Sequence, residues 1–105
     1  MEIKYDVEID NWVILNNIKK IINQIYRLLP SREEHSDWES PLNTIIVELC
    51  GMRSLLQIKE ETFFILLCKL EGLYSLKEEA DFFSYRRTIF ECLSLCNSLK
   101  EAFDE

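Results

Sequence analysis

Apolar residues recur every three or four positions along most of this chain, which is the period of an amphipathic helix. Polar and charged residues fill the positions between them. The pattern predicts four helices, at residues 10–29, 41–57, 60–73 and 76–103. Helices joined by short connections bury their apolar faces against one another. The sequence therefore predicts an all-α fold, with the four helices packed as an antiparallel bundle.

The first nine residues follow a different pattern. Ile3, Tyr5, Val7 and Ile9 are apolar and alternate with charged residues, which is typical of a half-buried strand. No later segment offers a second strand, and a lone strand cannot satisfy its own backbone groups. We expect residues 1–9 to form an extended arm across the helices. An earlier helix start is one alternative, and pairing with a sheet edge of a partner or of a second copy is another.

Two prolines predict where the first connection lies. Pro30 is expected to end the first helix at about Leu29, because the residue before a proline disfavours helical geometry. Ser40 followed by Pro41 resembles a helix N-cap and first helical residue. The residues between, 31–40, are expected to form a polar loop.

The later boundaries carry weaker signals. The apolar residues on either side of Gln57–Thr62 keep the same helical spacing. Residues 41–74 could therefore form one helix, and the bundle could have three long helices. A helix of about 33 residues is well above the usual length, which favours a break near Lys59. Gly72 is a candidate left-handed C-cap. Ser75 is a candidate N-cap, with Glu78 completing its capping box.

Length and composition fit one domain, residues 1–105, with a substantial core. Hydrophobic residues make up 48% of the chain, which contains two Gly and two Pro. The four cysteines lie in apolar stretches and are expected to be buried thiols rather than disulfides or metal ligands. Because neither a signal-peptide pattern nor an apolar run of about 20 residues is visible, we expect a cytoplasmic protein without a membrane partner.

The charge is acidic and clustered. The net charge is -7, which argues against direct nucleic-acid binding, since that requires a basic surface. Residues 31–41 hold four acids against one cation, a net charge of -3, and residues 76–105 hold seven against four, also -3, whereas residues 1–30 are neutral. Clustered acid of this kind can steer a basic protein partner towards the surface.

The sequence shows no group of residues typical of a catalytic, phosphate-binding or metal-binding site. His35 is the one imidazole and lies in the polar loop, and two glycines cannot build a phosphate-binding loop. No cysteine or carboxylate spacing is typical of a metal site. We therefore expect a protein that is not an enzyme, with no catalytic, cofactor-binding or metal-binding residue. A small-molecule pocket inside the aromatic-rich bundle is a minor alternative.

The candidate partner-binding residues lie in the polar loop and on the last helix. Trp38 stands among acids, where it is either an aromatic anchor for a partner or a side chain folded back over the bundle end. Tyr85 and Arg86 belong to residue types common at interfaces, although a solvated helix face also explains the arginine. The predicted contact surface consists of Glu33, Glu34, His35, Asp37, Trp38, Glu39, Tyr85 and Arg86.

No stretch of the chain resembles a known family motif. Small acidic helical proteins without catalytic groups include immunity proteins and inhibitors that neutralise basic nuclease toxins, a similarity of physical type only. The leading hypothesis is a protein-binding module of this kind, which would occlude a basic partner. The alternative is a homo-oligomeric structural or regulatory subunit, which would use the N-terminal arm and a surplus apolar line on the last helix: Phe83, Phe90 and Leu93.

Overall fold

The fold is built from helices alone in the part of the chain that the structure describes. The computed structural model describes the backbone of residues 2–103 and the side chains of residues 12–56 and 59–103. The elements in chain order are α1 (Glu2–Tyr26), α2 (Leu28–Glu33), α3 (Glu39–Gly51), η1 (Arg53–Lys59), α4 (Glu60–Gly72), η2 (Leu73–Ser75), η3 (Glu79–Asp81) and α5 (Phe82–Phe103), where η marks a short 3₁₀ helix. The predicted all-α class is confirmed.

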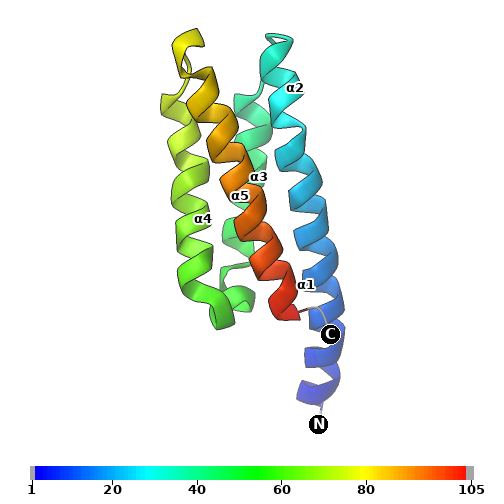
Figure 1. Ribbon diagram of the computed structural model, residues 1–105. Coiled ribbons are helices and arrows are strands. Elements are labelled where there is room, and N and C mark those ends of the chain that lie inside the picture. Colours follow the sequence, from blue (N-terminus) through cyan, green and yellow to red (C-terminus); the bar gives the residue numbers. More distant parts are fainter. Residues whose placement is uncertain (1, 104–105) are drawn as a thin grey trace.

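The four long helices lie around one core. Helix α1 contacts α3 and α5, and α4 contacts the same two helices, so each long helix has two neighbours. Figure 1 shows the chain reversing its direction between successive long helices, with α2 and the α3 start at the same end as the α4–α5 connection. The molecule is elongated, with extents of 54 × 23 × 20 Å. None of its described helices combines the length and apolarity needed to cross a bilayer.

The core is the set of inward-facing stripes that the helical period predicts. On α1 the buried residues are spaced by three or four positions, as expected for one helix face. The other long helices contribute matching stripes. The buried residues of these four helices are Ile14, Ile18, Ile21 and Ile25; Leu42, Ile45 and Leu49; Phe63, Leu66 and Leu70; and Tyr85, Ile89, Cys92, Leu93, Cys96 and Leu99.

The extended N-terminal arm is not seen. Helix α1 begins at Glu2, so the backbone of residues 2–9 is helical, which is the alternative of an earlier helix start. A helix satisfies its backbone groups internally, whereas a strand needs a neighbour. The side chains of residues 1–9 lie outside the described ones.

Pro30 interrupts the first helix earlier in the chain than predicted. Helix α1 ends at Tyr26, and Pro30 lies inside the first turn of α2. A proline has no N–H to donate four residues back and crowds that carbonyl, so the hydrogen-bond ladder breaks near Tyr26. Within its own first turn the missing N–H has no consequence, because those groups lack intrahelical partners. The helical path therefore continues to Glu33 and shortens the predicted loop.

Helix α3 is capped by a residue other than the predicted Ser40. The Asp37 carboxylate accepts hydrogen bonds from the backbone N–H groups of Glu39 and Ser40, at 3.0 and 3.1 Å. These are among the first N–H groups of the helix, which have no partners of their own. Helix α3 therefore begins one residue before Ser40.

The predicted break between the second and third helices is confirmed, although α3 ends at Gly51 rather than at residue 57. The segment between them, η1, contains Leu56 with non-helical angles (φ -104°, ψ 19°) and a fully buried side chain. The chain turns back here, and the kink at Leu56 keeps an apolar side chain in the core while the direction changes.

The predicted start of the last helix is too early. Gly72 has right-handed angles (φ -64°, ψ -21°), so it is not a left-handed cap, and the helical path runs on into η2. The Ser75 hydroxyl donates to the Gly72 carbonyl at 2.8 Å instead of capping the next helix. A cap forms one turn later, where the Glu78 N–H donates to the Asp81 carboxylate at 3.3 Å. Helix α5 therefore begins at Phe82.

Candidate functional site

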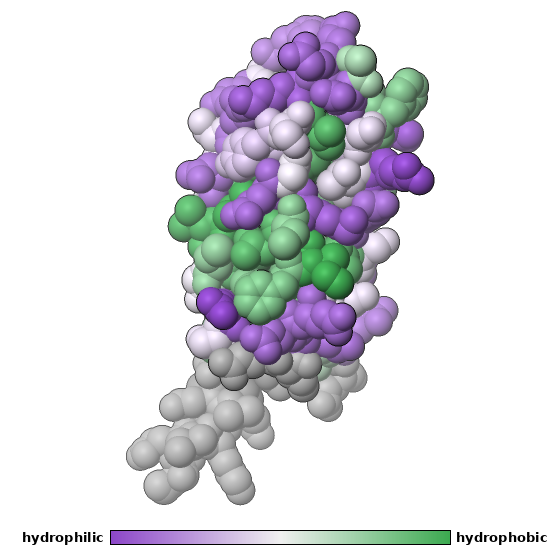
Figure 2. Space-filling model, turned by 90° about the vertical axis from the view of Figure 1, so that its left-hand side faces the viewer, coloured by the Kyte–Doolittle hydropathy of each residue, from purple (hydrophilic) through white to green (hydrophobic). Residues whose placement is uncertain are grey.

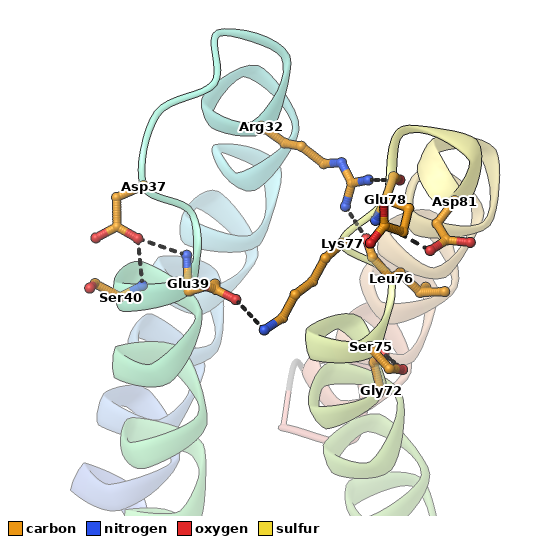
Figure 3. Close-up of polar contacts among 10 residues, drawn as sticks. All are labelled: Arg32, Asp37, Glu39, Ser40, Gly72, Ser75, Leu76, Lys77, Glu78 and Asp81. Carbon is orange, nitrogen blue, oxygen red and sulfur yellow. Dashed lines mark hydrogen bonds and ion pairs between the residues drawn. The ribbon is translucent and has the colours of Figure 1, made fainter.

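Arg32 joins two connections at one end of the bundle. Its side chain, on the last turn of α2, is only 9% exposed. Nη1 donates to the carbonyl oxygen of Leu76, and Nη2 donates to that of Glu78 at 2.7 Å. Figure 3 shows both bonds crossing from α2 to the segment that precedes α5. One side chain thus holds together two segments more than 40 positions apart in the sequence.

Three aromatic rings surround the same guanidinium. The Arg32 Cζ atom lies 4.4 Å from the ring centroid of Tyr85, 5.6 Å from that of Trp38 and 5.8 Å from that of Phe82. A planar guanidinium can contact ring faces while its edge donates hydrogen bonds. Sequence reasoning missed this role, since the one available signal was a lone cation within an acidic segment.

Trp38 is folded back over the bundle end. Its ring lies edge-on to that of Tyr85, with centroids 5.1 Å apart and planes at 74°, and it is half-buried against the core. This is the packing alternative of the sequence interpretation. The part of the ring that remains accessible lines a groove at this end of the molecule.

Tyr85 is buried, which removes it from the predicted contact surface. Its hydroxyl donates to the Leu28 carbonyl oxygen at 3.4 Å. Burial raises the pKa of the phenol well above its usual value, opposed by the nearby Arg32 charge. The apolar period of α5 places Tyr85 in the same stripe as Ile89 and Cys92, so its inward position follows from the helix face it occupies.

Acidic residues from two segments lie at the same end of the bundle as Arg32. The predicted four, in residues 33–39, are joined by three that precede α5 and were not predicted to lie nearby. The seven are Glu33, Glu34, Asp37, Glu39, Glu78, Glu79 and Asp81. With Arg32 and Lys77 as the two cations in these segments, the net charge of this end is -5. We call this end of the bundle, formed by residues 32–39 and 76–81, the acidic end.

Two of the predicted acidic residues make contacts that stabilise the fold. Asp37 caps α3, and hydrogen bonds from the Ser40 side chain and backbone lower the pKa of its carboxyl group. Glu39 pairs with Lys77 at 3.3 Å, which forms a second link between the two connections (Figure 3). Glu33 and Glu34 are exposed and face solvent.

An open groove of about 550 Å³ separates the two acidic segments. Glu33 and Glu79 contribute carboxylates to it, and Trp38 and Phe82 contribute aromatic surface. The remaining lining residues are Arg32, His35, Ser36 and Lys77. His35 has a left-handed backbone (φ 60°), which is uncommon for a residue other than glycine and turns the chain sharply beside the groove.

Arg86 lies apart from the groove, on the outer face of α5. Its guanidinium lies 5.3 Å from the ring centroid of Phe90. Phe83, Phe90 and Leu93 were predicted to form a second apolar line on this helix. Phe83 and Phe90 are exposed, whereas Leu93 is buried and belongs to the core. Of the eight predicted residues, the structure thus places the six in the range 33–39 at the acidic end, buries Tyr85 beneath it and places Arg86 elsewhere.

The cysteines differ in exposure. Cys92 and Cys96 are buried as predicted, whereas Cys50 and Cys68 are exposed, so the prediction is wrong for those two. Burial raises the pKa of both Cys92 and Cys96 to about 12, in the first case against the attraction of Lys69. Within the described residues, no three potential metal ligands of the His, Cys, Asp or Glu type cluster together.

Stability is expected to fall at alkaline pH because of the two buried thiols. Below the reference pKa of 9.0, each thiol is protonated in both states and has no effect. From pH 9.0 to about 12, the unfolded chain ionises while the folded chain does not. The free energy of unfolding should therefore drop by up to about 1.4 kcal/mol per pH unit for each thiol. Urea unfolding across this range measures it.

The alanine variants Cys92→Ala and Cys96→Ala provide the control for this expectation. Each should flatten the alkaline slope, with a residual slope from Tyr85 above pH 10.0. A slope unchanged in the double variant would contradict the assignment to the thiols.

Comparisons with family models, with curated proteins and with solved structures find no match to this chain.

Proposed function

We propose that this chain is an antiparallel four-helix bundle that acts as a non-enzymatic, cytoplasmic protein-binding module. In this proposal it is an immunity or inhibitor protein whose acidic end binds and occludes a basic partner, such as a nuclease toxin. The observation that carries the proposal is the convergence of two acidic segments, joined by Arg32, on one groove. A concave site with aromatic surface and carboxylates fits a cationic side chain.

The groove suggests how a partner would be held. A lysine or arginine of the partner would lay its apolar stem against Trp38 and Phe82 and place its charge between Glu33 and Glu79. Nη1 and Nη2 of Arg32 each donate to a backbone carbonyl, and Lys77 is paired with Glu39, so both cations already have partners within the chain. The surrounding carboxylates would speed association through long-range attraction.

The proposal is tested by neutralising acidic residues other than Asp37 and Glu39, whose contacts stabilise the fold. The triple variant Glu33→Gln, Glu34→Gln, Glu79→Gln should slow association with a basic nuclease encoded beside this protein by about tenfold or more at low salt. The loss should shrink at high salt, because salt screens the attraction. Stopped-flow fluorescence gives the association rate at each salt concentration.

A matched control changes the same charge elsewhere. Glu60→Gln, Glu71→Gln and Glu101→Gln neutralise three exposed acids outside the acidic end. Association should slow much less in this variant, since the net charge changes equally but the local field at the groove does not. Equal rates for the two triple variants, with folding intact, would refute the acidic end as the binding surface.

A second candidate function is a homo-oligomeric subunit. The observation that favours it is an apolar surface on α4, where Phe64, Ile65 and Cys68 are exposed and line a shallow hollow. Figure 2, which faces the α4 side of the molecule, shows apolar surface gathered there below a more polar region. Exposed apolar patches often mark interfaces. Sedimentation equilibrium tests this function, and a monomer at high micromolar concentration would eliminate it.

A further inference from the structure

The outer face of α5 carries an exposed aromatic stripe that the acidic end does not include. Phe83 is 79% exposed, the most of any large hydrophobic residue in the described side chains, and Phe90 is also exposed. The opposite face of α5 is buried in the core. Exposed phenylalanines on a helix whose inner face is already fully used contribute nothing to the core, and such surface is typical of a contact with another molecule.

The stripe has the geometry of a helix-docking seam. Phe83, Arg87 and Phe90 occupy positions i, i+4 and i+7, so they share one side of the helix over about 10 Å. Together with Arg86, Glu91 and Ser94 they line an open groove of about 410 Å³. A second helix with apolar residues at the same spacing would fit such a seam.

The charge of this face is opposite to that of the whole chain. The Arg86 guanidinium lies over the Phe90 ring, which leaves its edge available to a carboxylate. The Arg87 side chain is 82% exposed, with Nε 4.0 Å from the Glu91 carboxylate. The Glu91 carboxylate also forms an ion pair with Lys69 of α4, with Nζ and Oε1 2.9 Å apart, so its charge is compensated within the chain. The two arginines therefore dominate a basic site on a chain of net charge -7.

We propose that the outer face of α5 binds an acidic amphipathic helix of a partner protein. Its apolar side chains would pack between Phe83 and Phe90, and its carboxylates would accept hydrogen bonds from Arg86 and Arg87, pairs that arginine forms with good geometry. This surface shares no lining residue with the groove of the acidic end and is of opposite sign. The chain would thus present two docking surfaces for two kinds of partner.

Charge and symmetry favour this occupant over others. Two arginines are too few to hold a nucleic-acid backbone against the net charge of the chain. A second copy could place its acidic end on this face, but a contact between two unlike patches does not close into a dimer and would continue into a ring or an open chain of molecules. An acidic helix from a different protein has neither difficulty.

A designed peptide pair tests the proposal directly. One fluorescein-labelled helical peptide carries leucines at i, i+4 and i+7 flanked by glutamates, and its twin carries lysines in place of the glutamates. Fluorescence anisotropy, measured in the Glu33→Gln, Glu34→Gln, Glu79→Gln background so that the acidic end attracts the lysine twin less, should show binding of the glutamate peptide only. The double variant Arg86→Glu, Arg87→Glu should weaken that binding by about tenfold or more and should bind the lysine twin instead. Phe83→Ser should also weaken it.

The control makes the same change in charge at a distance. Lys19→Glu with Lys59→Glu reverses two exposed cations on other elements and should leave the affinity for the glutamate peptide within about twofold. Circular dichroism confirms folding of each variant. Equal binding of the two peptides, or equal losses in the two double variants, would overturn the proposal. So would a homodimer in sedimentation equilibrium that Phe83→Ser abolishes, since the occupant would then be a second copy.

Discussion

Replacing Phe63 with alanine is expected to lower the free energy of unfolding by about 4 kcal/mol. Phe63 is 1% exposed and lies in the core stripe of α4 with Leu66 and Leu70. Its removal takes apolar surface out of the core and leaves a cavity that the surrounding helices fill only in part. Because whole domains of this kind are stable by about 5–15 kcal/mol, the loss is a large share of the total. Urea unfolding followed by circular dichroism measures it.

Phe64 supplies a control at the next position. It is 37% exposed, with its ring edge-on to Phe63 at 5.3 Å and under the Arg53 guanidinium at 5.0 Å. Phe64→Ala removes the same atoms from a surface position, and we expect a loss of about 1 kcal/mol or less. Equal losses in the two variants would contradict the inward and outward faces assigned to α4.

Replacing Arg32 with methionine is expected to lower the free energy of unfolding by about 3 kcal/mol. Methionine retains an apolar stem of similar length but cannot donate to the carbonyl groups of Leu76 and Glu78. Those acceptors lose charged donors, and the rings around the guanidinium lose their cation. The two connections at the acidic end should then separate more readily.

Arg32→Lys distinguishes the shape of the side chain from its charge. Lysine keeps the charge but has no planar fork, so it cannot satisfy both carbonyls while covering the rings, and we expect it to recover less than half of the lost stability. Trp38 fluorescence, measured in a Trp12→Phe background, reports on the acidic end itself. Wild-type stability and an unshifted Trp38 emission in Arg32→Met would show that Arg32 does not hold this end together.

The helical stripes were predictable because each is a local property. A residue such as Leu66 or Ile89 is buried because its helix has an apolar face, and the period of three or four reveals that face without knowledge of the rest of the fold. The helix ends were less predictable. Pro30 breaks the ladder at the carbonyl four residues before it, and the cap of α3 comes from Asp37 rather than Ser40, because capping depends on which side chain reaches the free N–H groups.

The candidate site was predictable only in part. Glu33, Glu34 and Trp38 are close together because they are close in sequence, so their shared location needed no tertiary information. The contribution of Glu79 could not be found in this way, because it depends on the α4–α5 connection folding back beside α2. Tyr85 and Arg86 are adjacent in sequence, yet a helix turns successive residues by about 100°, so one is buried and the other exposed.

The sequence by itself determined the helical class, the inward face of each long helix and the acidic character of the chain, because periodicity and composition are set residue by residue. Only the tertiary structure decided that Arg32 joins two distant connections, that the carboxylates of both gather at one end, and that two arginines and two phenylalanines share the free face of α5. Those features depend on which helix ends meet and on which side of each helix its neighbours cover, and both are properties of the packed chain rather than of any one segment.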